Sequence, residues 1–283
     1  MEGEIVVYRG TGWIVKGFQH PENYVVAYPR YDLANRRKLT QVEEIRLVEE
    51  LSRYWSCIDR CVPMISVDEC RPVVPRASPL LEEFISLLSD ATGIDRANIA
   101  ASGSQSLGIE SSDPDLDIVI YASNPRYVYE ALLELRRLGI LKPLGLGDAW
   151  REYLSKHSKT MSFETYLRLR KNSVLQGTYR GHRYSVRIVP YTHGFRGCVE
   201  PVKVVMRSVE ATVTIVEPIT SFTTPATYEA IVNGRKMLFR TFRTLFTELE
   251  PSTTIRLSID VELVGGRYVA VPDHAKRVEI LDR

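Results

Sequence analysis

Apolar residues recur with two different spacings along the chain. Near the N-terminus two β-prone runs, Trp13-Ile14-Val15 and Tyr24 to Tyr28, flank the turn sequence His20-Pro21-Glu22-Asn23. This pattern predicts a β-hairpin within residues 5–31. Between residues 40 and 56 the apolar side chains are three or four positions apart, at Val42, Ile45, Val48, Leu51 and Trp55. That spacing predicts a helix, and Thr40 with Glu43 fits a capping box at its start.

The middle of the chain alternates between helix and strand patterns. Ser78-Pro79 is a typical helix start, and the apolar positions that follow predict a helix to about Ala91. Short apolar runs predict buried strands at 99–101 and 116–121. An amphipathic helix is expected over 125–138, ended by Gly139, and then two helices within 148–172 and a hairpin over 174–189. Such alternation is typical of a mixed α/β domain.

After residue 201 the chain becomes mostly β-prone, and Gly265-Gly266 separates two such runs as a two-residue hairpin turn. We therefore expect four parts: an N-terminal β-hairpin region (1–36), a helical connector (37–69), a central domain (70–200) and a C-terminal β-rich domain (201–283). The predicted fold class is α/β (α+β), with a mixed sheet in the centre and β-rich segments on both sides.

Composition narrows the function classes. The chain has 283 residues, of which 44% are hydrophobic and 25% are charged. This excludes an intrinsically disordered protein, which would have low hydrophobicity and high net charge. No apolar run approaches the roughly 20 residues of a membrane-spanning helix. The acidic start, Met1 to Glu4, lacks the basic and apolar regions of a signal peptide. We expect a cytoplasmic protein without a membrane partner, and nothing in the sequence indicates its oligomeric state.

The net charge of +2 conceals an uneven distribution. Residues 148–187 contain nine Lys or Arg and three Asp or Glu, a net charge of +6, which leaves −4 for the remainder. Aromatic residues are interleaved with these basic residues, at Trp150, Tyr153, Phe163, Tyr166, Tyr179 and Tyr184. Such a segment can bind nucleic acid or a triphosphate. It is equally compatible with solvated helix faces over core aromatics.

The four cysteines form no disulfide scaffold. Cys57, Cys61 and Cys70 lie close in sequence, whereas Cys198 is distant from them. Three nearby cysteines could hold zinc, but their spacing matches no common zinc motif. They could also be buried thiols, or form a disulfide within the cluster if the organism is a hyperthermophile.

Asp115 and Asp117 stand at the start of the predicted strand 116–121. Because strand side chains alternate between faces, residues two apart project from the same face. Two neighbouring carboxylates repel each other unless a cation lies between them, and their hard oxygen atoms suit Mg²⁺ or Mn²⁺. The same pair also fits a solvated turn before a strand. We predict a divalent-metal site at Asp115 and Asp117.

Gly103-Ser104 lies between the short strand 99–101 and a small helix expected around Gln105 to Gly108. Glycine lets the backbone approach an anion closely, and a hydroxyl with backbone N–H groups at a helix start can bind phosphate. A phosphate-binding turn that faces a divalent-metal site is suited to phosphoryl or nucleotidyl transfer.

The run from Gly103-Ser104 through Ser112-Asp113-Pro114-Asp115-Leu116-Asp117 into Ile118 to Tyr121 resembles the polymerase-β nucleotidyltransferase superfamily. It is most similar to an archaeal group of predicted nucleotidyltransferases. That group also has a His-Pro turn near its N-terminus, similar to the segment from Trp13 to Tyr31, and a phrase like Phe222-Thr223-Thr224-Pro225 in its C-terminal β region. The strong match covers about residues 95–125. The resemblance implies a nucleotidyltransferase fold over 70–200.

One departure from the superfamily pattern concerns its third carboxylate, which lies on a later strand, helps to hold the metal and accepts the proton of the attacking hydroxyl. The matching strand here is Tyr184 to Pro190, and Ser185 and Arg187 occupy the alternating positions. Neither is acidic, and serine is a poor base near neutral pH. Asp113 could substitute, two carboxylates could suffice, or the site could bind nucleotide without efficient turnover.

The resemblance implies attack of a hydroxyl acceptor, RNA among the candidates, on the α-phosphate of a nucleoside triphosphate, with release of pyrophosphate. Gly103 and Ser104 would bind the β and γ phosphates, Arg187 would contact phosphate, and Asp115 and Asp117 would hold Mg²⁺. Two alternatives remain: a degenerate member that binds RNA or nucleotide without turnover, and an interaction scaffold of β modules.

Overall fold

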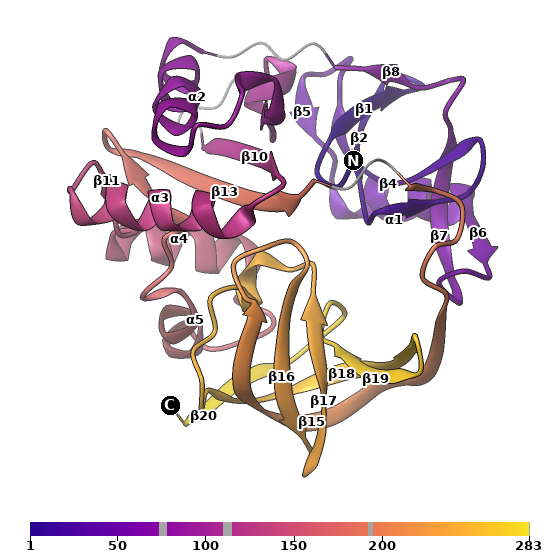
Figure 1. Cartoon of the computed structure of the whole chain (residues 1–283). Helices are drawn as coiled ribbons and strands as arrows, with labels where there is room; N and C mark the ends of the chain where they lie inside the picture. The colour runs from indigo at the N-terminus through magenta and orange to yellow at the C-terminus, as the bar shows by residue number, and fades with distance from the viewer. Residues whose placement is uncertain (74–77, 110–114, 192–194, 283) are drawn as a thin grey trace. The chain divides into compact units, whose positions relative to one another are not determined.

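The computed structural model describes residues 1–73, 78–109, 115–191 and 195–282. The chain forms two compact units, and each contains two stretches of sequence. The first unit comprises residues 1–123 and 184–201, and the second comprises residues 124–183 and 202–283. The expected central domain, 70–200, is therefore divided between the units. We describe each unit by itself (Figure 1).

The N-terminal part of the first unit is a seven-stranded sheet in the order β6-β7-β4-β2-β1-β8, with β5 paired to β4. Its strands are β1 (Ile5–Tyr8), β2 (Thr11–Val15), β4 (Tyr24–Asp32), β5 (Arg37–Lys38), β6 (Ser52–Trp55), β7 (Arg60–Ser66) and β8 (Arg71–Pro72). The short β3 (Gln19–His20) pairs instead with β14 (Phe195–Arg196). The predicted hairpin of residues 5–31 is thus part of a larger sheet, whose core contains Trp13 and Ile65.

Helix α1 (Gln41–Leu51) begins at the predicted capping box of Thr40 and Glu43 but ends earlier than expected. Residues 52–55 form β6, in which Trp55 pairs with Arg60 of β7. The helical connector predicted for 37–69 is therefore partly strand. Val42 and Ile45 of the predicted apolar face are exposed. Leu47 and Leu51 of α1 instead pack against the sheet core.

The rest of the first unit contains a small mixed sheet and one helix. Its elements are α2 (Pro79–Thr92), η1 (Arg96–Asn98), β9 (Ile99–Ala101), η2 (Gln105–Leu107), β10 (Leu116–Ala122) and the part of β13 (His182–Pro190) that begins at Tyr184. Strand β9 is antiparallel to β10, and β13 is parallel to β10. Helix α2 begins as predicted, with Ser78 accepting from the Leu81 N–H and Pro79 in the first turn, and it ends at Gly93 in the left-handed conformation.

The cysteine pairing differs from every expectation. Cys57 forms a disulfide with Cys198, 141 positions away, while Cys61 and Cys70 are free thiols. The zinc cluster and the disulfide within the cluster are both wrong, because the buried Cys57 has its partner in the segment after β14.

The second unit begins with α3 (Pro125–Arg137), β11 (Leu141–Lys142), α4 (Leu146–Lys156), α5 (Phe163–Arg170) and β12 (Gln176–Tyr179). The predicted helix over 125–138 and the two helices within 148–172 are confirmed to within a few residues. Asn124 accepts from the Tyr127 N–H at the start of α3, and Gly139 follows its end with a positive φ of 72°.

The C-terminal part of the second unit is a closed sheet. Its strands are β15 (Val202–Thr220), β16 (Ala226–Val232), β17 (Arg235–Thr241), β18 (Thr254–Val264), β19 (Arg267–Val271) and β20 (Val278–Asp282), with η3 (Thr244–Phe246) after β17. The order is β15-β16-β17-β19-β18-β20, and β15 also pairs with β18, which closes a five-stranded ring. Strand β17 is parallel to β19. The hairpin turn predicted at Gly265-Gly266 joins β18 to β19.

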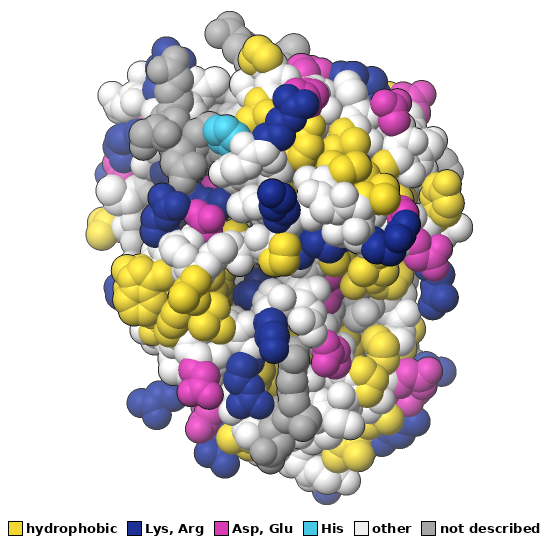
Figure 2. Space-filling view, turned by 90° about the vertical axis from the view of Figure 1, so that its left-hand side faces the viewer, with side chains coloured by type: hydrophobic (Ala, Val, Ile, Leu, Met, Phe, Trp, Pro, Cys, Tyr) yellow, Lys and Arg dark blue, Asp and Glu magenta, His cyan; other side chains and the backbone are white. Residues whose placement is uncertain are grey.

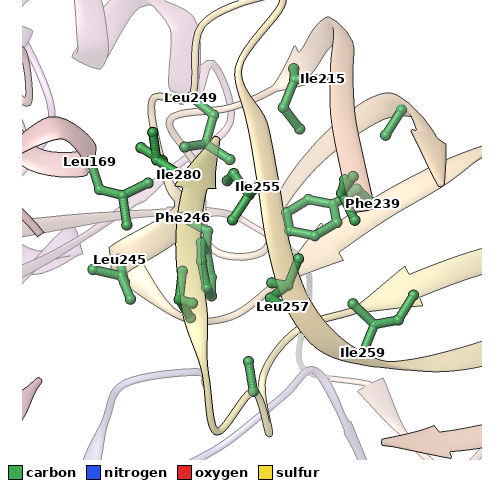
Figure 3. Close-up of a cluster of buried hydrophobic side chains, with 14 of the residues drawn as sticks. Leu169, Ile215, Phe239, Leu245, Phe246, Leu249, Ile255, Leu257, Ile259 and Ile280 are labelled. Carbon is green, nitrogen blue, oxygen red and sulfur yellow. The ribbon is translucent and has the colours of Figure 1, made fainter. Parts of the chain in front are cut away.

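Hydrophobic side chains fill the inside of this closed sheet. Phe239, Phe246, Ile255 and Leu257 are fully buried there. Leu169 of α5 belongs to the same core, so this helix packs against the sheet (Figure 3). The prediction of a mixed α/β chain with a β-rich C-terminal part is therefore confirmed at that level. Among the described residues, no helix is both long enough and apolar enough to cross a membrane.

Candidate functional site

The parallel pairing of β10 with β13 brings together the residues that sequence reasoning selected. Asp117 is in register with Ser185, and Val119 with Arg187. Residues in register on parallel neighbours project to the same face, so the Asp117 carboxylate, the Ser185 hydroxyl and the Arg187 guanidinium share one face of this sheet. All three side chains are half-buried, which leaves part of each accessible to solvent.

Gly103 lies directly against Asp117. A Cβ atom at position 103 would collide with the Asp117 carboxylate oxygen Oδ2, and the φ of Gly103 is +72°. Both observations require glycine. The main chain fixes the approach, since the Ser102 N–H donates to the Asp117 carbonyl oxygen at 2.8 Å. The Gly103 turn and the Asp117 carboxylate therefore form one local unit.

Ser104 follows in a tight turn. Its carbonyl oxygen accepts from the N–H groups of Leu107 and Ile109. The small helix expected here is a three-residue 3-10 turn, η2, and the Ser104 side chain makes no capping hydrogen bond. A turn this short has no appreciable helix dipole, so any phosphate binding would depend on the hydroxyl and local N–H groups.

Asp115 immediately precedes β10 and is half-buried. The Asp117 N–H donates to the Asp115 carbonyl oxygen at 3.1 Å. The Gln105 side-chain amide donates to the same carbonyl at 3.2 Å, which ties η2 to the strand start. Asp113, the substitute acid considered above, lies outside the described residues.

Arg187 has an acidic neighbour that sequence reasoning missed. Its Nη1 lies 4.0 Å from Oε1 of Glu2, a side chain that is 0% exposed. Lys16 Nζ donates to the same Glu2 oxygen at 3.3 Å, and the Gly17 N–H donates to the other. The Glu2 charge is thus buried between two cations and a backbone donor, which is the arrangement a buried carboxylate requires.

Tyr31 of β4 is a second residue that the sequence did not indicate. It is buried, and burial together with the nearby Asp117 charge raises the pKa of its hydroxyl to about 12, with Arg187 acting in the opposite direction. Tyr31 therefore remains protonated in any ordinary buffer. No local motif marks Glu2 or Tyr31, because each reaches this site through strand pairing of the N-terminal sheet.

Part of the positive charge in the segment 148–187 is paired with acidic side chains or buried. Arg151 pairs with Asp148, Lys156 pairs with Glu152, and the buried Arg170 donates to the Thr244 carbonyl oxygen. Four of its aromatic side chains pack against one another in edge-on and tilted contacts: Trp150, Tyr153, Phe163 and Tyr166. Figure 2, which faces the side of α3 and α4, shows a hydrophobic patch there. On α4, the side chains of Leu146, Trp150 and Leu154 are exposed.

Asp115 and Asp117 supply oxygen donors of the type that Mg²⁺ and Mn²⁺ prefer. Among the described ranges, no group of three or more His, Cys, Asp or Glu side chains could hold a metal ion. A cation held by Asp115 and Asp117 alone would complete its coordination with water or substrate oxygens. Ser185, the residue in register with Asp117 on β13, is not acidic.

Comparison with known proteins adds no assignment: no family model, no curated protein and no solved structure matches this chain.

Proposed function

We propose that the protein is a divalent-metal-dependent nucleotidyltransferase, which moves a nucleoside monophosphate from a nucleoside triphosphate to a hydroxyl acceptor, with RNA as one candidate. The main support is the close contact of the Gly103 backbone with Asp117, next to the parallel pairing of Asp117 with Ser185. A phosphate-binding turn and a metal-binding carboxylate must be adjacent if one triphosphate is to touch both.

Each residue has a defined task in this proposal. Asp115 and Asp117 hold Mg²⁺, which neutralises charge on the triphosphate when bound. The Gly103 backbone and the Ser104 hydroxyl bind the β and γ phosphates. Arg187, on the same face as Asp117, contacts phosphate through its guanidinium, and the buried Glu2 carboxylate lies 4.0 Å from it.

A second function has a specific observation in its favour. With Ser185 in place of a carboxylate, no strong base stands in register with Asp117. A protein that binds nucleotide or RNA without turnover is therefore the competing proposal.

Transfer of label from α-³²P nucleoside triphosphates, with Mg²⁺ or Mn²⁺ and with RNA, DNA or protein as acceptor, tests the first proposal. We expect labelling that requires metal and that Asp117→Asn abolishes. Asp90→Asn, an exposed carboxylate in α2, is the matched control and should retain activity. Nucleotide binding without labelling of any acceptor, unchanged in Asp115→Ala, would favour the binding protein.

A further inference from the structure

The closed sheet of the second unit has an uneven distribution of charge. Its neighbouring strands β16, β17 and β19 carry four basic residues and one acidic residue, a net charge of +3. Strands β15 and β18 carry three basic and four acidic residues, a net charge of −1. The basic residues of the first group are Arg235, Lys236, Arg240 and Arg267. One side of the closed sheet is thus positive.

Strand pairing concentrates this charge at one end. Strands β17 and β19 are parallel, with Leu238 in register with Val269, so both strands start at the same end. Arg235 and Lys236 open β17, and Arg267 and Tyr268 open β19. We call these four side chains the basic end. All four are exposed, and 55% of the tyrosine surface is accessible to solvent.

The acidic residue of this side does not cancel its charge. Glu229 of β16 pairs with Lys236 at 2.6 Å, which leaves the arginines at the starts of β17 and β19 in excess. Ile231, in register with Lys236, is also exposed and adds an apolar contact surface beside the cations. Cations combined with an exposed aromatic ring suit a chain of phosphates that carries unstacked bases. A duplex would not offer its base faces to Tyr268.

The strand order supports this surface as a binding face. If β15 to β19 are counted as the first to fifth strands, their order around the ring is first, second, third, fifth, fourth, and then the first again. The third and fifth strands, β17 and β19, are parallel, and η3 lies between β17 and β18 in the sequence. This is the strand order of the OB-fold, in which the second and third strands and adjoining loops often bind oligonucleotides. Here those strands are β16 and β17, which lie side by side in Figure 1.

We propose that the basic end binds single-stranded nucleic acid, with Arg235, Lys236 and Arg267 on phosphates and Tyr268 stacked on a base. The binding needs neither the metal nor the nucleotide of the proposed transfer reaction. If both proposals hold, this surface binds the acceptor strand.

Fluorescence anisotropy with a labelled single-stranded 12-nucleotide RNA, and with its DNA equivalent, tests the proposal on the full chain without divalent metal. We expect Lys236→Glu with Arg267→Glu to weaken binding at least tenfold. This change should also reduce the slope of log K against log salt by about 1.4, as expected for two lost phosphate contacts on a single strand. Tyr268→Ala should weaken binding by about fivefold or more, because stacking contributes 1–3 kcal/mol per base.

Lys203→Glu with Arg256→Glu, on β15 and β18, changes the net charge equally and is the matched control. Circular dichroism verifies folding of each variant. The proposal is overturned if the wild type binds neither oligonucleotide below about 100 μM, if the control pair weakens binding as much as the test pair, or if Tyr268→Ala has no effect. Asp117→Asn should bind normally, so loss of transfer activity and loss of strand binding are distinguishable.

Discussion

The backbone of Gly103 lies against the carboxylate of Asp117, and no other residue type fits there because of both the positive φ and the lack of space for a Cβ atom. Gly103→Ala should therefore lower stability by about 1–3 kcal/mol and reduce nucleotide binding. Gly10→Ala is the control, since Gly10 has a similar φ of +76° but open space around its Cα. Urea unfolding measures the stability of the two variants. Equal losses in the two variants would argue against a collision at Asp117.

Adding a carboxylate at position 185 tests whether the site lacks a general base. Because this position stands in register with Asp117 on the parallel neighbour, Ser185→Asp places a carboxylate on the same face. We expect metal-dependent transfer of labelled nucleotide to increase by at least about tenfold, since a positioned general base typically contributes about 10²–10⁴-fold. Ser185→Asn has nearly the same shape without the charge and should bring no increase. A similar rate in both variants would show that this position does not need a base.

Glu2 is fully buried and accepts from Gly17 and Lys16, with Arg187 at 4.0 Å. Glu2→Gln removes the charge and leaves two cations near a buried amide. The expected cost is about 3 kcal/mol in unfolding free energy, from the cost of breaking a buried ion pair. Glu22→Gln, at an exposed position, should change stability by less than about 0.5 kcal/mol. Chemical denaturation compares the two.

The disulfide between Cys57 and Cys198 closes a loop of more than 140 residues. Chain-entropy arguments give such a cross-link up to about 5 kcal/mol. Cys57→Ser should therefore lower the melting temperature substantially, and a reducing agent should destabilise the wild type but not this variant. Cys61→Ser, which removes an exposed free thiol, should leave melting unchanged. Thiol titration of the unfolded protein should find two reactive groups before reduction and four afterwards.

Burial lowers the pKa of His20 to about 4, and the neutral ring accepts from the Val26 N–H at 3.3 Å. An unfolded histidine titrates near 6.5, so the unfolded state binds a proton first. The stabilisation of the folded state by the neutral His20 ring is therefore complete above about pH 6.5 and is lost as the pH falls toward 4. Burial likewise lowers the pKa of His157 in the second unit to about 4. Between pH 7 and pH 4.5 the free energy of unfolding should depend less on pH in His20→Gln than in the wild type. It should depend still less on pH in the double variant with His157→Gln. An unchanged profile would contradict this assignment.

Short-range signals in the sequence are sufficient for several elements. Ser78-Pro79 and Gly93 mark both ends of α2, and Gly265-Gly266 marks a hairpin, because caps and turns depend on neighbouring residues. Gly103 directly follows β9, whose Ala101 pairs with Ile118 of β10, so its contact with Asp117 comes from two strands that are close in the sequence. These parts of the fold can be deduced without knowledge of distant contacts.

Long-range pairing is what the sequence does not reveal. Cys57 meets Cys198, and Glu2 meets Arg187, through strand arrangements that no spacing rule encodes. For Val42 and Ile45 the sequence predicted a buried helix face, but both side chains are exposed. Apolar residues at helical spacing do not by themselves show which face of the helix is covered. The sequence also did not reveal that part of the positive charge of segment 148–187 is neutralised or buried, since Arg151 and Lys156 pair with acidic residues and Arg170 is buried.

The order of assembly during synthesis follows from the way the chain returns to the first unit. Asp117 emerges from the ribosome well before Ser185, its neighbour on β13, because the segment from Asn124 to Arg183 is made in between. At about 5–20 residues per second, roughly 70 further residues take several seconds. During that interval the edge of β10 that later pairs with β13 is unpaired, and the incomplete site is accessible to factors near the ribosomal exit tunnel.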